Sequence, residues 1–212
     1  MSYRSSGFTL IEMIVVMAIF GIVTTILVAN LPTFRDQSSL DLVAQEVAIN
    51  IRGAQVFGGS GRVGSVVGKP TYGIHFDLST GPTQQFLLFR DGAGFNENNG
   101  EYDAGSGCGQ ADSECVEAYA ISNGYVIESV CESDGNIDNG ATSCPTSING
   151  TLDILFTRPS LEPKFTINGT VNVNSELVLI TVKSLRNNQT RLINVWRNGQ
   201  IATSAGLTTP TP

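Results

Sequence analysis

The longest apolar run in the chain lies close to its N-terminus. Residues 13–31 contain no charged side chain, and Pro32 follows directly after them. At about 1.5 Å of rise per residue, a helix over 8–31 would cover the roughly 30 Å of a bilayer's hydrocarbon core. The pattern therefore predicts a membrane-spanning helix over residues 8–31.

A second helical pattern follows Pro32, with apolar residues three and four positions apart. This spacing is typical of a helix with one buried face. Glycine-rich residues 58–61 are expected to end the helix. We therefore predict an amphipathic continuation over 32–58, with Pro32 as a bend. The residues of its buried face are Leu40, Val43, Ala44, Val47, Ala48, Ile51 and Ala54.

Beyond residue 59 the hydrophobic period changes to two, which is typical of strands. Asn123-Gly124 predicts a tight hairpin between two of them, and Asn198-Gly199 predicts a later turn. One long N-terminal helix followed only by strands implies an α+β fold, with the helix packed on an antiparallel sheet. The predicted strands are 72–76, 85–89, 118–121, 125–127, 152–157, 164–173, 176–183 and 191–196.

Glu12 does not fit an ordinary membrane anchor. A carboxylate inside an apolar span costs at least a few kcal/mol unless a cation pairs with it. No Lys or Arg lies within helical reach of Glu12 in its own segment. Its partner is therefore expected on another chain or at a free amino terminus. The alternative is a signal-anchor helix whose glutamate reaches the membrane interface.

Residues 7–12 read Gly-Phe-Thr-Leu-Ile-Glu, after a short polar leader, 1–7, that carries Arg4. This segment resembles the prepilins of type IV filaments, which include pilins and the pseudopilins of type II secretion. The resemblance implies cleavage between Gly7 and Phe8 by a prepilin peptidase, followed by N-methylation of Phe8. It also implies that Glu12 pairs with the N-terminal amine of a neighbouring subunit. A free amine of that kind is the partner that the apolar span lacks.

The position of this cut decides the expected location of the protein. A secretory signal is cut after its apolar core, whereas here the cut precedes the run and the run is retained. Arg4 places the N-terminus in the cytoplasm by the positive-inside bias. We expect a single-pass protein of the inner membrane, with a periplasmic domain that later enters a filament. The resemblance implies three partners: other pilin or pseudopilin subunits, the prepilin peptidase and methyltransferase, and an inner-membrane assembly platform.

Within this class the chain is most similar to the H-type minor pseudopilins of type II secretion. The likeness rests on helix 40–56, on the closing strand 191–195 and on the Gly-x-Ile turn 199–201. It implies a non-enzymatic subunit that acts in protein secretion across the outer membrane. A minor pilin of a type IV or competence pilus has the same motif. The expected organisation is a leader 1–7, helical segments 8–31 and 32–58, a β-rich domain 59–204 and a tail 205–212.

The composition argues against one class of partner. The chain has 212 residues, a net charge of −7 and a pI of about 4.6, so a nucleic-acid partner is not expected. Much of the acidic surplus lies within a polar insert at about 91–150. A membrane-anchored binding or adhesion module that uses this insert is an alternative from another class. An anchored hydrolase is a further one, but His75 is the only histidine and forms no recognisable catalytic set in the sequence.

Four cysteines lie within the insert. An even number on the exported side of a membrane suggests two disulfides rather than free thiols, and three pairings are possible. Pairing Cys108 with Cys115 and Cys131 with Cys144 closes the shortest loops. A zinc site is disfavoured because there is no C-x-x-C motif and the histidine is distant in sequence.

The beginning of the insert, residues 91–103, is dense in carboxylates, amides and glycines. Hard oxygen ligands of this kind suit Ca²⁺, and some pseudopilins carry a structural calcium. The order of residues departs from that of an EF-hand loop. A structural calcium held by Asp91, Asn96, Asn98 and Asp103 is therefore a hypothesis, and a solvated turn-rich loop is the alternative.

Overall fold

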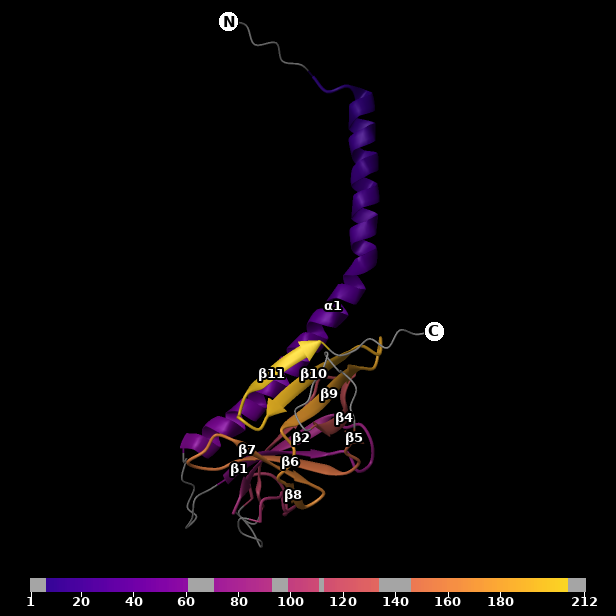
Figure 1. Ribbon diagram of the computed structural model, residues 1–212. Coiled ribbons are helices and arrows are strands. Elements are labelled where there is room, and N and C mark those ends of the chain that lie inside the picture. Colours follow the sequence, from indigo (N-terminus) through magenta and orange to yellow (C-terminus); the bar gives the residue numbers. More distant parts are fainter. Residues whose placement is uncertain (1–6, 61–70, 93–98, 111–112, 134–145, 206–212) are drawn as a thin grey trace, which may run out of the picture. The chain divides into compact units, whose positions relative to one another are not determined.

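The computed structural model describes residues 7–60, 71–92, 99–110, 113–133 and 146–205. These residues form one long helix and a set of strands that follow it in sequence, as the sequence predicts (Figure 1). The chain divides into two compact units, residues 1–39 and 40–212. The helix α1 (Leu10–Ser60) contributes to both units, and it is continuous through Pro32.

The first unit is the apolar part of α1. Its residues Leu10–Val28 have a mean hydropathy of 2.6, and this segment is long and apolar enough to cross a membrane. Thr9 precedes the helix, and its hydroxyl accepts a hydrogen bond of 3.3 Å from the backbone N–H of Glu12, as in an N-cap. The hydroxyls of Thr24 and Thr25 donate to carbonyl oxygens four residues earlier. Their polar groups are thereby satisfied inside the helix, as an apolar surrounding requires.

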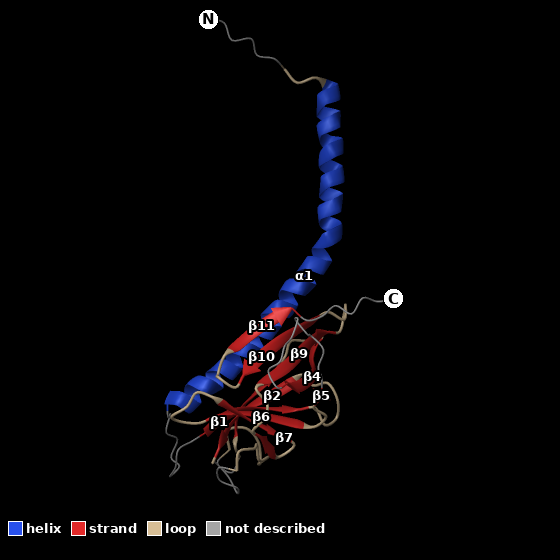
Figure 2. Ribbon diagram, viewed as in Figure 1, coloured by secondary structure: helices blue, strands red, loops and turns tan. Residues whose placement is uncertain are grey.

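The second unit contains two antiparallel sheets. The first sheet has the strand order β3-β2-β1-β6-β7-β8, and the second has the order β11-β10-β9-β4-β5 (Figure 2). The strands of the first are β1 (Thr71–Asp77), β2 (Gln85–Asp91), β3 (Cys115–Ala120), β6 (Thr151–Phe156), β7 (Pro163–Ile167) and β8 (Thr170–Asn172). Those of the second are β4 (Tyr125–Ser133), β5 (Thr146–Ser147), β9 (Leu177–Ser184), β10 (Thr190–Trp196) and β11 (Ile201–Ala205).

The core of this unit lies between the C-terminal half of α1 and the two sheets. All seven apolar residues expected on the buried face of the helix are 9 % exposed or less, so the predicted amphipathic segment is confirmed. They share one hydrophobic cluster with strand residues such as Phe76, Phe156 and Ile193. The α+β, pilin-like fold is thus the one that the change of hydrophobic period predicts.

Polar contacts fix the same helical segment to the last two strands. The Arg52 guanidinium donates to the carbonyl of Ile201 at 2.7 Å. An ion pair joins Asp41 to Arg191 on β10. These contacts position β10 and β11 beside the helix, where they lie in Figure 1.

Two expectations about the strands are wrong. The predicted strand 164–173 is a hairpin, because Asn168 and Gly169 adopt positive φ angles of 49° and 72° and turn the chain between β7 and β8. The Asn123-Gly124 dipeptide does not close a hairpin. The strands on either side of it diverge, since β3 pairs with β2 whereas β4 pairs with β9 in the other sheet.

Candidate processing and assembly site

The predicted cleavage site lies in a short non-helical segment just before α1. Gly7, Phe8 and Thr9 are all exposed, and the helix begins at Leu10. The Phe8 side chain is 76 % exposed, and no atom lies within 4 Å of the position that a Cβ on Gly7 would take. A peptidase can therefore approach the Gly7–Phe8 bond without unfolding a helix.

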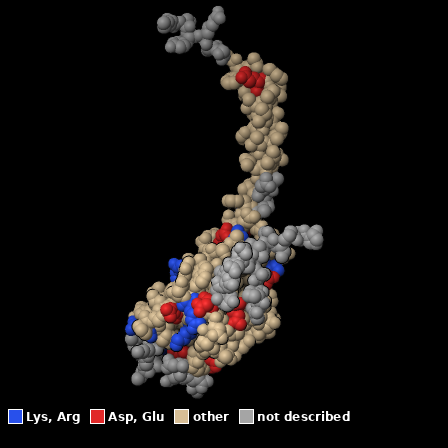
Figure 3. Space-filling view, in the orientation of Figure 1, with Lys and Arg blue, Asp and Glu red and all other residues tan. Residues whose placement is uncertain are grey.

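Glu12 lies in the first turn of α1 and is exposed. The helix dipole favours a negative charge at this end. Glu12 is the only charged residue between Phe8 and Phe34. Figure 3 shows this part of the helix without basic side chains and with acidic atoms close to its start. Within the described ranges Glu12 takes part in no ion pair, so its charge is available to a group from another molecule.

Comparison with known families and proteins identifies the class. Residues 2–28 match the sequence model of the prokaryotic N-terminal methylation motif. No curated protein and no solved structure gives a significant match. The motif and the pilin-like fold support a type IV prepilin-like protein. The motif implies processing by a prepilin peptidase and assembly with pilin subunits, and the apolar helix is consistent with a membrane anchor.

The residues of the hypothetical calcium site are only partly described. Asn96 and Asn98 lie outside the described residues. Asp91 and Asp103 bind neighbouring groups of the chain: the Asp91 carboxylate accepts the N–H of Gly100 at 3.1 Å, and that of Asp103 accepts from the Asn99 amide at 3.0 Å. Within the described ranges no three His, Cys, Asp or Glu side chains are grouped to hold a metal. Calcium binding stays a prediction, and a calcium-dependent rise in melting temperature would test it.

The three described cysteines lie in two different parts of the domain. A disulfide joins Cys108 to Cys115, the first residue of β3. Cys131 on β4 is fully buried and is also disulfide-bonded, whereas Cys144 lies outside the described residues. The first bridge closes a short loop directly before β3, beside the acidic residues of the insert.

Glu114 organises this loop, although no pattern in the sequence singles it out. Its two carboxylate oxygens accept the backbone N–H groups of Gly92 at 3.2 Å and Asp103 at 2.8 Å. Burial raises the pKa of the Glu114 carboxyl to about 7; the two hydrogen bonds oppose that rise, and the nearby Asp91 and Asp103 carboxylates add to it. At neutral pH this buried group is therefore poised between its charged and neutral forms.

The raised pKa predicts that the domain loses stability as the pH increases. The Glu114 carboxyl has a folded-state pKa of about 7 and an ordinary value of 4.5. Its stabilising contribution to the free energy of unfolding is therefore fully present below about pH 4.5. It is lost as the pH rises through about 7. We expect a loss on the order of 1–3 kcal/mol in the free energy of unfolding. Urea denaturation of the full chain in detergent, at a series of pH values, measures it.

Glu114→Gln is the matched control, because an amide has no charge to lose over this range. The difference in unfolding free energy between wild type and variant is expected to change with pH, whatever other groups titrate. A difference that stays constant from about pH 5 to about pH 8 would contradict the assignment.

His75 is more than the ordinary strand residue that the sequence predicts. Its Nδ1 lies 2.7 Å from a carboxylate oxygen of Asp153, its register partner on β6. The Tyr102 ring covers the imidazole, with the ring centroids 4.7 Å apart. Both members of the pair are buried. Only the register between β1 and β6 brings them together, so no local sequence signal could have revealed the contact.

Proposed function

We propose that this protein is a minor pseudopilin of a type II secretion system. The supporting observation is the exposed Gly7–Phe8 bond directly before a helix whose only charge up to Phe34 is Glu12. Cleavage creates a new amine at Phe8, and methylation keeps its positive charge. When the helix leaves the bilayer for a filament core, Glu12 pairs with such an amine on an adjacent subunit. The amine is the positively charged partner that the buried Glu12 carboxylate requires in an apolar surrounding.

The folded domain, rather than the N-terminal motif, favours a secretion pseudopilus over a pilus. Helix residues 40–56 and the closing strand, which resemble those of the H-type subunits, form one packed unit. Arg52 and Asp41 of the helix bond directly to β11 and β10. The protein is then an inner-membrane precursor with a periplasmic domain, and the pseudopilus is its assembled form.

Mass spectrometry of the native protein tests the processing step. The expected product begins at Phe8 and carries one added methyl group. A native protein that begins at Met1 would exclude the proposal, because no amine would be available at Phe8.

Deletion of the gene tests the choice of system. We expect the deletion strain to retain folded exoproteins in the periplasm and to recover secretion when the gene is restored. Normal secretion together with lost piliation or lost DNA uptake would instead assign the chain to a type IV or competence pilus. Function that survives loss of the assembly ATPase would point to a binding or adhesion module.

A further inference from the structure

The face of the first sheet that points away from α1 carries a polar surface. Alternation along β6 places Ile154 and Phe156 in the cluster with the helix, so Asp153, Leu155 and Thr157 lie on the opposite side. The registers of β1 and β7 continue this surface. Leu155 is paired with Gly73 on β1 and with Lys164 on β7.

A cavity of about 660 Å³ opens on this surface. Its volume lies within the range typical of small-molecule sites. The sheet forms its floor, residues 99–100 and β8 form two of its walls, and Arg197 reaches it from the end of β10 in the other sheet. Its polar and charged lining includes Thr71, Asp91, Thr157, Lys164, Asn172 and Arg197.

Two cations face this cavity without an acidic partner. In the described part of the chain, the Lys164 ammonium group makes no ion pair or hydrogen bond, and its residue is exposed. The Arg197 guanidinium donates to the carbonyls of Val173 and Ser175, which are neutral acceptors. Among the described lining residues Asp91 is the only acid, and it is 3 % exposed with one oxygen already bonded to the Gly100 N–H. The accessible charge of the cavity is therefore positive.

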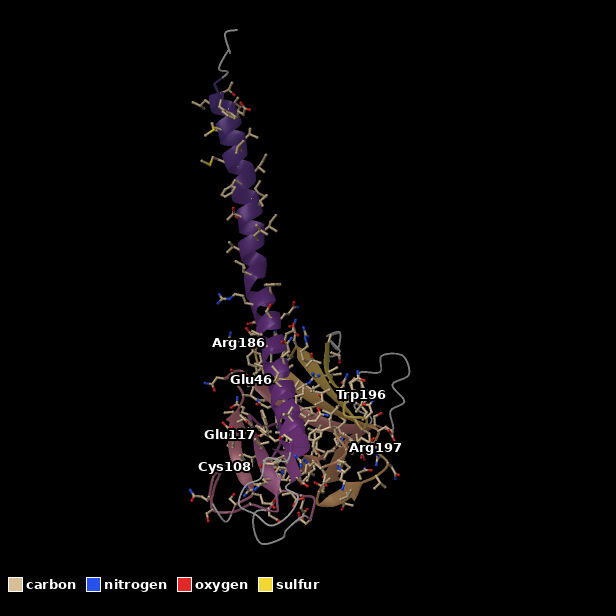
Figure 4. The ribbon with its side chains drawn as sticks, turned by 90° about the vertical axis from the view of Figure 1, so that its left-hand side faces the viewer. Glu46, Cys108, Glu117, Arg186, Trp196 and Arg197 are labelled. Carbon is tan, nitrogen blue, oxygen red and sulfur yellow. A yellow bond between two sulfur atoms is a disulfide. The ribbon has the colours of Figure 1, made fainter. Side chains whose placement is uncertain are left out.

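The remaining walls consist of hydrogen-bonded threonines and apolar valines. The Thr71 and Thr157 hydroxyls lie 3.3 Å apart, and the Thr166 hydroxyl donates to the Gly100 carbonyl at 2.6 Å. Val171 and Val173 line the cavity and are 46 % and 64 % exposed. Figure 4 shows Arg197 on the side of the domain opposite Cys108. Neither Cys108 nor Cys115 is among the described residues that line the cavity.

We propose that this cavity binds the carboxylate of a small ligand, supplied by an acidic sugar or by the C-terminus of a peptide. Lys164 and Arg197 hold the carboxylate, because ammonium and guanidinium groups form strong charge-assisted hydrogen bonds with it. Val171 and Val173 contact the apolar part of the ligand, and the threonine hydroxyls bond to its polar groups. This binding does not depend on the assembly role of Glu12.

Pairs of ligands that differ only in the carboxylate test the proposal. The full chain in a non-ionic detergent is titrated with galacturonate against galactose, and with trialanine against trialanine amide, and binding is followed by saturation-transfer NMR. In at least one pair the acid is expected to bind about tenfold more tightly than its neutral counterpart. The pair that responds identifies the source of the carboxylate. Raising the salt from about 0.05 M to about 0.5 M is expected to weaken this binding.

Three variants locate the binding. Lys164→Gln and Arg197→Gln each remove one cation, and Val171→Trp fills the cavity without changing its charge. Each is expected to weaken binding of the acid about tenfold or more. The control Lys183→Gln removes a cation that pairs with Glu128 outside the cavity, and it is expected to bind as wild type does.

Three results would overturn the proposal. The first is equal binding of acid and neutral counterpart in both pairs. The second is binding that survives in all three cavity variants. The third is no detectable binding of either acid at about 10 mM, ten times a Kd of about 1 mM. Melting temperatures of the variants show whether a loss of binding reflects a loss of fold.

Discussion

Replacing Glu12 with leucine is expected to give a protein that is inserted and cleaved but enters filaments poorly. Leucine fits an apolar helix, so insertion of the segment Leu10–Val28 is retained. In the proposed filament the defect arises on the neighbouring subunit, whose methylated Phe8 amine is left buried without a counter-charge. Removing one partner of a buried pair costs about 3–5 kcal/mol, so we expect incorporation to fall by at least about 100-fold.

The measurement separates processing from assembly. Mass spectrometry of the membrane fraction reports cleavage, and immunoblots of sheared filaments against membranes report incorporation. Glu12→Asp keeps the charge on a shorter side chain and is expected to assemble better than Glu12→Leu. Met13→Leu, a neutral change at the adjacent position, is the control. Wild-type incorporation of Glu12→Leu would remove the pairing mechanism, whereas loss of cleavage would assign Glu12 to the peptidase.

The parts of this protein that sequence predicts well are those that local periodicity determines. Leu40, Val47 and Ile51 follow one helical face, and all three are buried because that face packs against the strands. Gly7, Phe8 and Glu12 lie within one short motif that the methylation-motif match covers, and their individual roles stay predictions.

What the sequence does not predict depends on register between distant strands. Asp153 meets His75 because β6 pairs with β1, and Lys164 shares a cavity with Arg197 although they come from different sheets. Asn123-Gly124 illustrates the same limit. The dipeptide indicates a turn, but the partners of the flanking strands are chosen by residues far away in the chain.

The glycines near the end of α1 show how one residue type can have two roles. The sequence predicts that residues 58–61 end the helix, and α1 ends at Ser60 with Gly58 inside its last turn. A Cβ on Gly58 would lie 2.4 Å from the carbonyl oxygen of Phe156 on β6. Gly58 is therefore required by the close approach of the helix to the sheet. Gly53, five residues earlier, has no atom within 4 Å of its Cβ position apart from its own neighbouring helix backbone.

The two glycines are therefore expected to respond to alanine in opposite directions. Gly53→Ala removes only the entropic cost of a glycine in a helix, and it should stabilise the protein by about 0.5–1 kcal/mol. Gly58→Ala gains the same propensity but forces the helix away from backbone atoms of β6, which should give a net destabilisation of about 1–3 kcal/mol. Urea denaturation of the two variants beside wild type measures both. Equal stability of Gly58→Ala and Gly53→Ala would contradict this prediction. It would mean that the helix does not approach Phe156 of β6 as closely as these contacts require.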